Sequence, residues 1–126
     1  MDLKNKIQTT VDGYFDAFDK GSAEAVVALF AEDATVEDPV GSKVRTGAEG
    51  LLKFYSGAMS MQCKITPTGP ARIVENEAAF PFHGVVQLPD KVMEFDCIDV
   101  MTFNDDGKIL TMRAFWGPGN TSYTAK

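Results

Sequence analysis

The sequence has few of the side chains on which most metal and nucleophile chemistry depends. Its 126 residues include one histidine, His83, and two cysteines, Cys63 and Cys97. A zinc site with three or four His or Cys ligands does not fit, because these three residues do not lie at ligand spacing. A Ser-His-Asp triad would depend entirely on His83. An enzyme of this composition must therefore take its acid–base groups mainly from carboxylates and tyrosines.

Positive charge and long apolar runs are also scarce. The chain has 12 basic and 18 acidic residues, so its formal net charge is −6. This balance argues against a nucleic-acid partner and against an anionic membrane surface. There is no run of 18 apolar residues, and the first residues do not begin a signal peptide. We therefore expect one soluble domain, residues 1–126, in the cytoplasm, with both thiols reduced.

The first half of the chain has the apolar spacing of helices. Ile7, Val11, Tyr14 and Phe18 recur on one stripe, and Lys20-Gly21 is a typical helix end. Ser22 is a suitable N-cap for a second helix over 23–31. A third helix is expected to begin at Thr46, where Thr46-Gly47-Ala48-Glu49 has the form of a capping box. A short strand over 34–38 is expected between the second and third helices.

Strand patterns replace the helical ones after residue 60. The expected strands are 62–74, 77–88, 91–103 and 109–117, and turn residues such as Asn104-Asp105-Asp106-Gly107 separate them. Short connections indicate antiparallel neighbours, and Pro67 and Pro70 suggest that 62–74 is an edge or bulged strand. This order predicts an α+β fold in which three N-terminal helices pack on a curved, mostly antiparallel sheet. Such a cone-shaped arrangement encloses an apolar cavity.

Two carboxylates fall on the apolar faces of predicted strands. In 91–103, Asp99 shares its face with Phe95, Cys97 and Met101, since side chains two residues apart point the same way. Asp38 shares a face with apolar residues of the strand 34–38, beside its end at Pro39. A carboxylate in a core must become protonated or find strong donors. Taken alone, each of these residues is more simply explained as a structural one.

Two tyrosines add to the set of candidates. Tyr14 lies on the apolar stripe of the first helix, and Tyr55 follows Leu51 by four residues on the third helix. A buried tyrosine hydroxyl needs a hydrogen-bond partner. Two carboxylates and two tyrosines assigned to one cavity are harder to explain as structural residues, because ionisable groups in contrasting environments are typical of acid–base sites.

These residues resemble those of the bacterial Δ5-3-ketosteroid isomerases, within the nuclear-transport-factor-2-like (SnoaL-like) superfamily. The resemblance runs almost end to end, and its strongest segments are 28–41, Phe54-Tyr55, Ile98-Asp99 and 112–116. The occurrence of Tyr14, Asp38 and Asp99 together is more specific than the Asp-Ala-Thr-Val segment, which many members of the superfamily share.

The resemblance implies a role for each matching residue. Asp38 corresponds to the general base, while Tyr14 and a protonated Asp99 correspond to the donors to the ketone oxygen. Tyr55 corresponds to a residue that hydrogen-bonds Tyr14. The substrate would be a small apolar steroid, with no metal and no cofactor. The positions that correspond to the lining of the steroid cavity are Phe54, Phe82, Phe95, Met112, Ala114 and Trp116.

Some features depart from the family or stay open. Phe30 stands where some members have a third network tyrosine, and Gly84 replaces a larger apolar residue, which would widen the cavity. Alternation places His83 on the outer face of its strand. The family also implies a homodimer through the outer sheet face, where we expect Ile73, Val85, Ile109 and Phe115 to point. The alternatives are another SnoaL-like enzyme, such as a cyclase, dehydratase or epoxide hydrolase, and a non-catalytic binding or dimerisation module.

Overall fold

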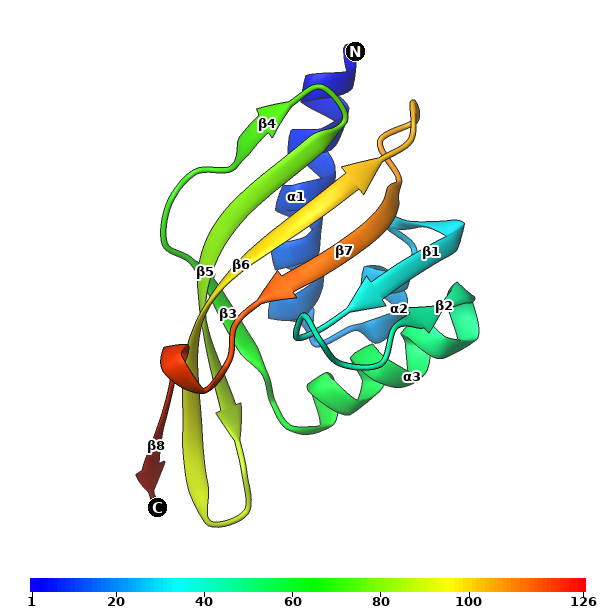
Figure 1. Cartoon of the computed structure of the whole chain (residues 1–126). Coiled ribbons are helices and arrows are strands. Elements are labelled where there is room, and N and C mark those ends of the chain that lie inside the picture. Colours follow the sequence, from blue (N-terminus) through cyan, green and yellow to red (C-terminus); the bar gives the residue numbers. More distant parts are fainter.

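Three helices pack on one face of a curved, mixed sheet in the computed structural model, which describes all 126 residues (Figure 1). The α+β fold predicted from the sequence is confirmed. The helices are α1 (Leu3–Lys20), α2 (Ala23–Val27) and α3 (Gly47–Ser60), with a 3-10 turn η1 (Pro118–Asn120). The strands are β1 (Phe30–Glu37), β2 (Arg45–Thr46), β3 (Lys64–Pro67), β4 (Arg72–Val74), β5 (Glu77–Gln87), β6 (Lys91–Phe103), β7 (Ile109–Phe115) and β8 (Thr121–Ala125).

Helix α1 has the ends and the buried stripe that its sequence predicts. The side chain of Asp2 caps it by accepting a hydrogen bond from the backbone N–H of Asn5. It ends at Gly21, which adopts a φ of 67° in the left-handed region that glycine tolerates best. Its buried residues include Ile7, Val11 and Tyr14. The stripe therefore places the Tyr14 hydroxyl inside the core.

Two helix predictions were wrong in detail. The second helix ends at Val27 and not at residue 31, because Phe30 already begins β1 beside Ile109 of β7. The capping box at the start of α3 does not form, since the Thr46 side chain makes no capping hydrogen bond. Local sequence signals predicted the presence of both helices, whereas pairing of the following residues with the sheet determines where α2 ends.

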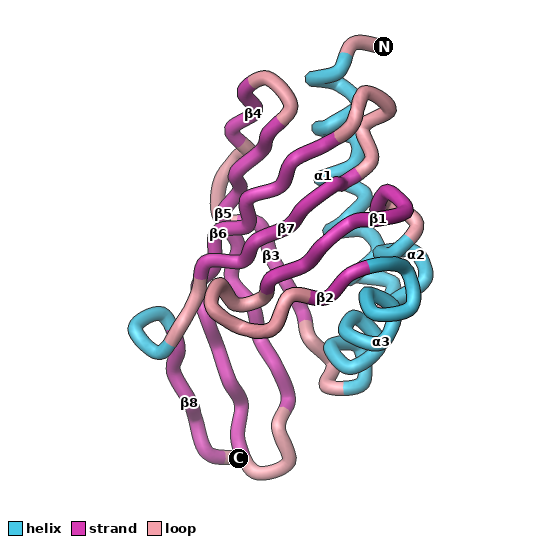
Figure 2. Tube along the Cα trace, turned by 45° about the vertical axis from the view of Figure 1, so that its right-hand side comes forward, coloured by secondary structure: helices cyan, strands magenta, loops and turns pink.

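The sheet has the strand order β2-β1-β7-β6-β5-β3, with β4 paired to β5 and β8 paired to β6. The pair β1–β7 is parallel and the other pairs are antiparallel. Strands β5 and β6 are long, and each pairs with two short strands along its length. In the orientation of Figure 1, the upper part of β6 pairs with β7 and its lower part pairs with β8. The upper part of β5 pairs with β4 and its lower part pairs with β3. Their hairpin and β8 therefore project beyond the helices (Figures 1 and 2).

The strand predicted over 62–74 is interrupted, and the last strand was not predicted. Residues 68–71 separate β3 from β4, in the region of the two prolines, and each of these short strands pairs only with β5. This agrees with the predicted edge position. Strand β8 was missed because its residues are polar and mostly exposed, so no apolar alternation marks them.

The two faces of the sheet differ in what covers them. The inner face packs against the helices, and the outer face has no helix over it (Figure 2). Ile109 was predicted on the outer face, but it is fully buried. A register irregularity between Thr102 and Phe103 shifts the alternation of β7 at this point, so the prediction for Ile109 was wrong. Ile73 is half-buried and packs on the core, whereas Phe115 is exposed as expected.

Candidate active site

A cavity of about 980 Å³ lies between α3 and the lower parts of β5 and β6. Its volume is at the upper end of the range of small-molecule pockets, which is roughly 300–1,000 Å³. One helical stripe of α3 forms a wall, and several of its residues are small, so the wall does not fill the space. That stripe consists of Gly50, Lys53, Phe54, Gly57 and Ala58, and Met61 continues it just beyond the end of the helix. Val86, Leu88, Met93, Phe95 and Trp116 form the facing wall.

Asp38 lies in the wall of this cavity, just beyond the end of β1. Its Oδ1 accepts a hydrogen bond of 2.7 Å from the indole Nε1–H of Trp116. Burial raises the pKa of the Asp38 carboxyl, while the hydrogen bond from Trp116 and the positive charge of Arg45 act in the opposite direction. Asp38 thus has both a donor and a cation that favour its ionised form, and it borders open space.

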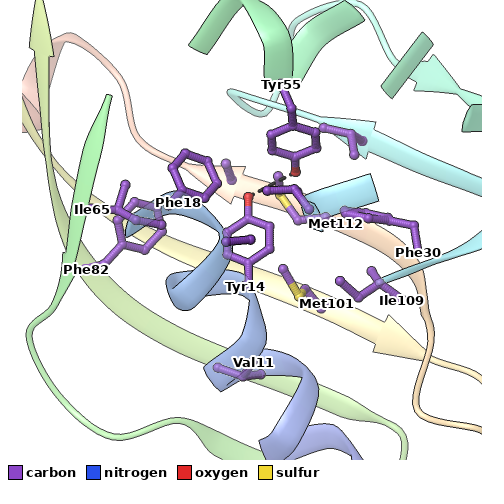
Figure 3. Close-up of a cluster of buried hydrophobic side chains, with 14 of the residues drawn as sticks. Val11, Tyr14, Phe18, Phe30, Tyr55, Ile65, Phe82, Met101, Ile109 and Met112 are labelled. Carbon is purple, nitrogen blue, oxygen red and sulfur yellow. Dashed lines mark hydrogen bonds between the residues drawn. The ribbon is translucent and has the colours of Figure 1, made fainter. Parts of the chain in front are cut away.

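Tyr14 and Tyr55 face one another in the core. Their hydroxyl oxygens are 2.9 Å apart and form the hydrogen bond that the family resemblance implied (Figure 3). The two tyrosines are 2% and 1% exposed. Burial is the main reason that the pKa of each phenol is raised well above its ordinary value. Both phenols therefore favour their protonated form, and one hydroxyl donates to the other.

Asp99 is the one buried charged or polar residue of the chain, with 1% of its surface exposed. It points inward from β6 between Phe80 of β5 and Ala114 of β7, as the alternation predicted. The thiol of Cys97 donates to Oδ1 at 3.5 Å, and the buried Oδ2 has no hydrogen-bond partner. Burial, together with the charge of Asp38, raises the pKa of this carboxyl well above its ordinary value. Both effects favour the protonated form of Asp99, and its Oδ2 has no hydrogen-bond partner in the structure.

These groups lie within electrostatic reach of one another. Burial is the largest cause of the raised pKa of both Asp99 and Tyr14, and the charge of Asp38 adds to both rises. Asp38 borders the cavity, whereas Tyr14, Tyr55 and Asp99 are buried and are not part of its lining. The structure therefore has one carboxyl group at the cavity and, outside its lining, a buried carboxyl and two buried phenols whose pKa values are raised well above their ordinary values.

Three of the six predicted lining residues border the cavity. Phe54, Phe95 and Trp116 do so, and the rings of Phe95 and Trp116 stack with centroids 4.9 Å apart. The other three, Phe82, Met112 and Ala114, are buried in the core next to the donors. Contact of these three with a ligand stays a prediction.

Gly84 does not widen the cavity, contrary to the expectation from its small size. The ring of Phe95, its cross-strand partner, lies directly over it, so a Cβ at residue 84 would be 2.3 Å from Phe95 Cζ. The glycine thus allows the Phe95 ring to lie against the strand, where it stacks on Trp116.

Sequence reasoning missed two features of the site. The donor role of Trp116 towards Asp38 was not foreseen, because the two residues are 78 positions apart and only the fold brings them together. The cavity is also bordered by Lys43, Arg45 and Lys53, which look like ordinary surface charges in the sequence. No local pattern marks either feature.

His83 lies on the outer face, as predicted, away from the cavity. Its ring nitrogens are 2.9 Å from a carboxylate oxygen of Glu94 and 2.9 Å from one of Asp96, and these contacts raise its pKa. It has no contact with the candidate site.

Comparison with known proteins agrees with this geometry. Residues 11–112 match the SnoaL-like domain family. The chain is 40% identical over 122 residues to a steroid Delta-isomerase of Nocardioides simplex, and the match covers 97% of this chain and 98% of that protein. A solved structure of SalBIII, an epoxide hydrolase/cyclase-like enzyme described in pyran ring formation in the polyether salinomycin, superposes with a TM-score of 0.89. That match covers 96% of this chain and 98% of the other at 28% identity.

The fold and the family match define a member of the SnoaL-like, nuclear-transport-factor-2-like proteins. Within that class, the identity over nearly the whole length shows that the chain belongs to the ketosteroid isomerase family and is an isomerase.

Proposed function

We propose that this protein converts 3-oxo-Δ5-steroids into conjugated 3-oxo-Δ4-steroids. The observation that carries the proposal is the contrast between two carboxyl groups: Asp38 borders an apolar cavity and accepts a hydrogen bond from Trp116, whereas Asp99 is buried and its Oδ2 lacks a partner. The similarity to a steroid Delta-isomerase supports the substrate class. The apolar rings around the cavity favour a rigid hydrocarbon body, since burial of apolar surface gains roughly 25 cal/mol per Å² before the costs of binding.

Asp38 is the proposed general base. Its carboxylate removes a proton from the carbon between the ketone and the alkene, and the C–H electrons move into a dienolate with the charge on oxygen. The protonated Asp38 then returns the proton to the far end of the dienolate, which shifts the double bond into conjugation. The proton stays on one side chain between the two steps, so the reaction needs no oxidant, metal or cofactor. A positioned base of this kind contributes roughly 10²–10⁴ in rate.

Tyr14 and Asp99 are the proposed donors to the oxygen on which the charge develops. Their raised pKa values keep both groups protonated, and an ionised Asp99 would instead repel the dienolate. Tyr55 supports Tyr14 through the hydroxyl pair. A preorganised donor in a dry site is worth on the order of 10²–10³ in rate.

The uncovered outer face of the sheet supports a homodimer as part of the proposal. Ile98, Leu110 and Phe115 are 48%, 37% and 43% exposed there, on strands that no helix covers. Ile98 and Phe115 are cross-strand partners, and exposed apolar side chains in such a position are typical of an interface between subunits. Sedimentation should show a dimer at micromolar concentration, and a monomer would contradict this part of the proposal.

No helix of the structure is both long and apolar enough to cross a membrane. A cytoplasmic location stays a prediction from the sequence.

The second candidate is an epoxide-opening reaction on the same fold. It is favoured by the likeness to SalBIII at 28% identity, and an acid at a cavity could protonate or attack an epoxide. The experiment is to add androst-5-ene-3,17-dione to the protein and to record the ultraviolet absorbance. Growth of the conjugated-enone band supports the isomerase. Binding without a spectral change would indicate a binding module, and turnover of an epoxide alone would favour the second candidate.

A further inference from the structure

Three positively charged side chains border the cavity without an acidic partner. Lys43 and Lys53 are exposed and Arg45 is half-buried, so they occupy the solvent end of the cavity. The ion pairs of the structure involve only His83 and Arg113, so none of these three cations has a carboxylate within 4.0 Å. The chain has 18 acidic and 12 basic residues. A cavity entrance with unpaired cations is therefore opposite in charge to the chain as a whole.

Arg45 differs from the two lysines in how it is held. Its guanidinium lies 4.4 Å from the centroid of the Phe54 ring, and it donates to the backbone oxygens of Asp38 and Lys43. Its charge lowers the pKa of Asp38, so its position is explained by the proposed base. The ammonium groups of Lys43 and Lys53 make no hydrogen bond. They are free to bind something else.

Ten of the 17 residues that line the cavity are hydrophobic, and Asp38 is the single carboxylate among them. A wholly apolar ligand gains nothing from the two ammonium groups and partly removes them from water, which is unfavourable. A ligand with an apolar body and an anionic group at one end would bury its body against the rings and place its charge beside the lysines. Charge complementarity of this kind selects between ligands of equal apolar area.

Building on the proposed function, we infer that the preferred substrate is a 3-oxo-Δ5-steroid with an anionic group at the end remote from its ketone, bound by Lys43 and Lys53. The ketone end points inward to the donors, so the opposite end of the fused rings points to the entrance. The rigid ring system keeps the anion away from Asp38. A carboxylate or a sulfate satisfies the same chemistry.

The test uses product-like ligands that are not converted, so that it does not depend on turnover. Trp116 is the only tryptophan of the chain and borders the cavity, so its fluorescence reports binding. The ligands are 3-oxo-androst-4-ene-17β-carboxylic acid and its methyl ester, which differ in charge. We expect the acid to bind roughly tenfold more tightly, since two exposed ion pairs each add a modest amount. The preference should shrink between 20 mM and 500 mM salt, since ions screen exposed charges.

A pair of variants assigns the preference to the two lysines. In Lys43→Gln/Lys53→Gln the ratio of ester to acid dissociation constants should fall to about one. The matched control is Lys4→Gln/Lys64→Gln, which removes the same charge from exposed positions outside the cavity lining and should keep the wild-type ratio. Restoration of the preference in Lys43→Arg/Lys53→Arg would exclude a merely structural effect.

A third pair of ligands, testosterone and testosterone sulfate, distinguishes the anions. Tighter binding of both anions indicates a general anion site, and tighter binding of the acid alone specifies a carboxylate. Equal binding of acid and ester by the wild type overturns the inference, as does an equal loss of preference in both double variants. Tight binding of the acid without isomerisation of any 3-oxo-Δ5-steroid would instead refute the proposed function and leave the anion site in place.

Discussion

The two carboxylates of the site share an apolar setting but differ in their partners. Asp38 receives a hydrogen bond from Trp116 and lies near the positive charge of Arg45. Asp99 receives only a weak thiol donor from Cys97, and its other oxygen is unpartnered. Burial raises both pKa values; Trp116 and Arg45 oppose the rise at Asp38, whereas at Asp99 only Cys97 opposes it and the charge of Asp38 adds to it. Asp38 is also only half-buried, whereas Asp99 is fully buried, so burial and the number of donors act in the same direction to separate the pKa values of the two acids.

The largest expected effect is that of removing the proposed general base, Asp38. Asp38→Asn keeps the shape and can still accept the hydrogen bond from Trp116, but it cannot take a proton from carbon. We expect turnover to fall by roughly 10²–10⁴ while steroid binding persists. Ultraviolet assays measure turnover, and equilibrium titration measures binding. Wild-type turnover in this variant would remove Asp38 from the mechanism.

The next largest effect is expected for the two proposed donors, Tyr14 and Asp99. Tyr14→Phe and Asp99→Leu should each lower turnover by about 10²–10³, because each removes one donor to the same oxygen. The double variant should lose less than the product of the two factors, since the effects of residues that serve one atom are coupled. A double-mutant cycle measures this coupling from the steady-state rates of the wild type, the two single variants and the double variant. If the loss of turnover in the double variant equals the product of the two single losses, Tyr14 and Asp99 do not donate to the same oxygen.

The protonation states also predict how stability depends on pH. Folded Asp99 keeps its proton while the unfolded carboxyl, with a pKa of about 3.9, ionises, so wild-type stability decreases as pH rises above that value. The decrease is roughly 1.4 kcal/mol per pH unit up to the folded pKa. Asp99→Asn cannot titrate, so its free energy of unfolding relative to wild type should increase with pH.

Urea unfolding at a series of pH values from 4 to 8 measures this difference, and Asp38→Asn is the control. The free energy of unfolding of Asp38→Asn relative to wild type should also increase with pH, but over a narrower range of pH, because the pKa of Asp38 is raised less strongly. A pH-independent difference for Asp99→Asn would show that Asp99 is ionised in the folded protein.

The smallest effect is expected for Trp116, the hydrogen-bond donor that Asp38 has and Asp99 lacks. Trp116→Phe removes the indole N–H that favours ionised Asp38 but retains an aromatic ring beside Phe95. The pKa of Asp38 should therefore rise, and the acid limb of the pH–rate profile should move to higher pH. At a pH above that limb we expect a loss of only a few fold. An unmoved acid limb would mean that Trp116 does not set the protonation of Asp38.

The sequence predicted the positions that regular elements control. Asp99 is inside because β6 alternates without interruption up to Met101, and Tyr14 is inside because α1 has an unbroken apolar stripe. Ile109 was misplaced because the register of β7 shifts next to Phe103. The Trp116–Asp38 contact and the cationic entrance could not be predicted, because they join segments far apart in the chain and depend on side-chain direction rather than on periodicity.

Strands β5 and β6 pair with different short strands along their length, and the cavity wall and the buried Asp99 lie in different parts of these two strands. The lower parts, with Val86 and Met93, form the cavity wall and are flanked by β3 and β8. The upper part of β6, flanked by β7, holds Asp99, six residues beyond Met93, or roughly 20 Å along the strand. Evolution or a protein engineer can therefore reshape the entrance for a new side chain of the substrate without disturbing the register that buries the acid.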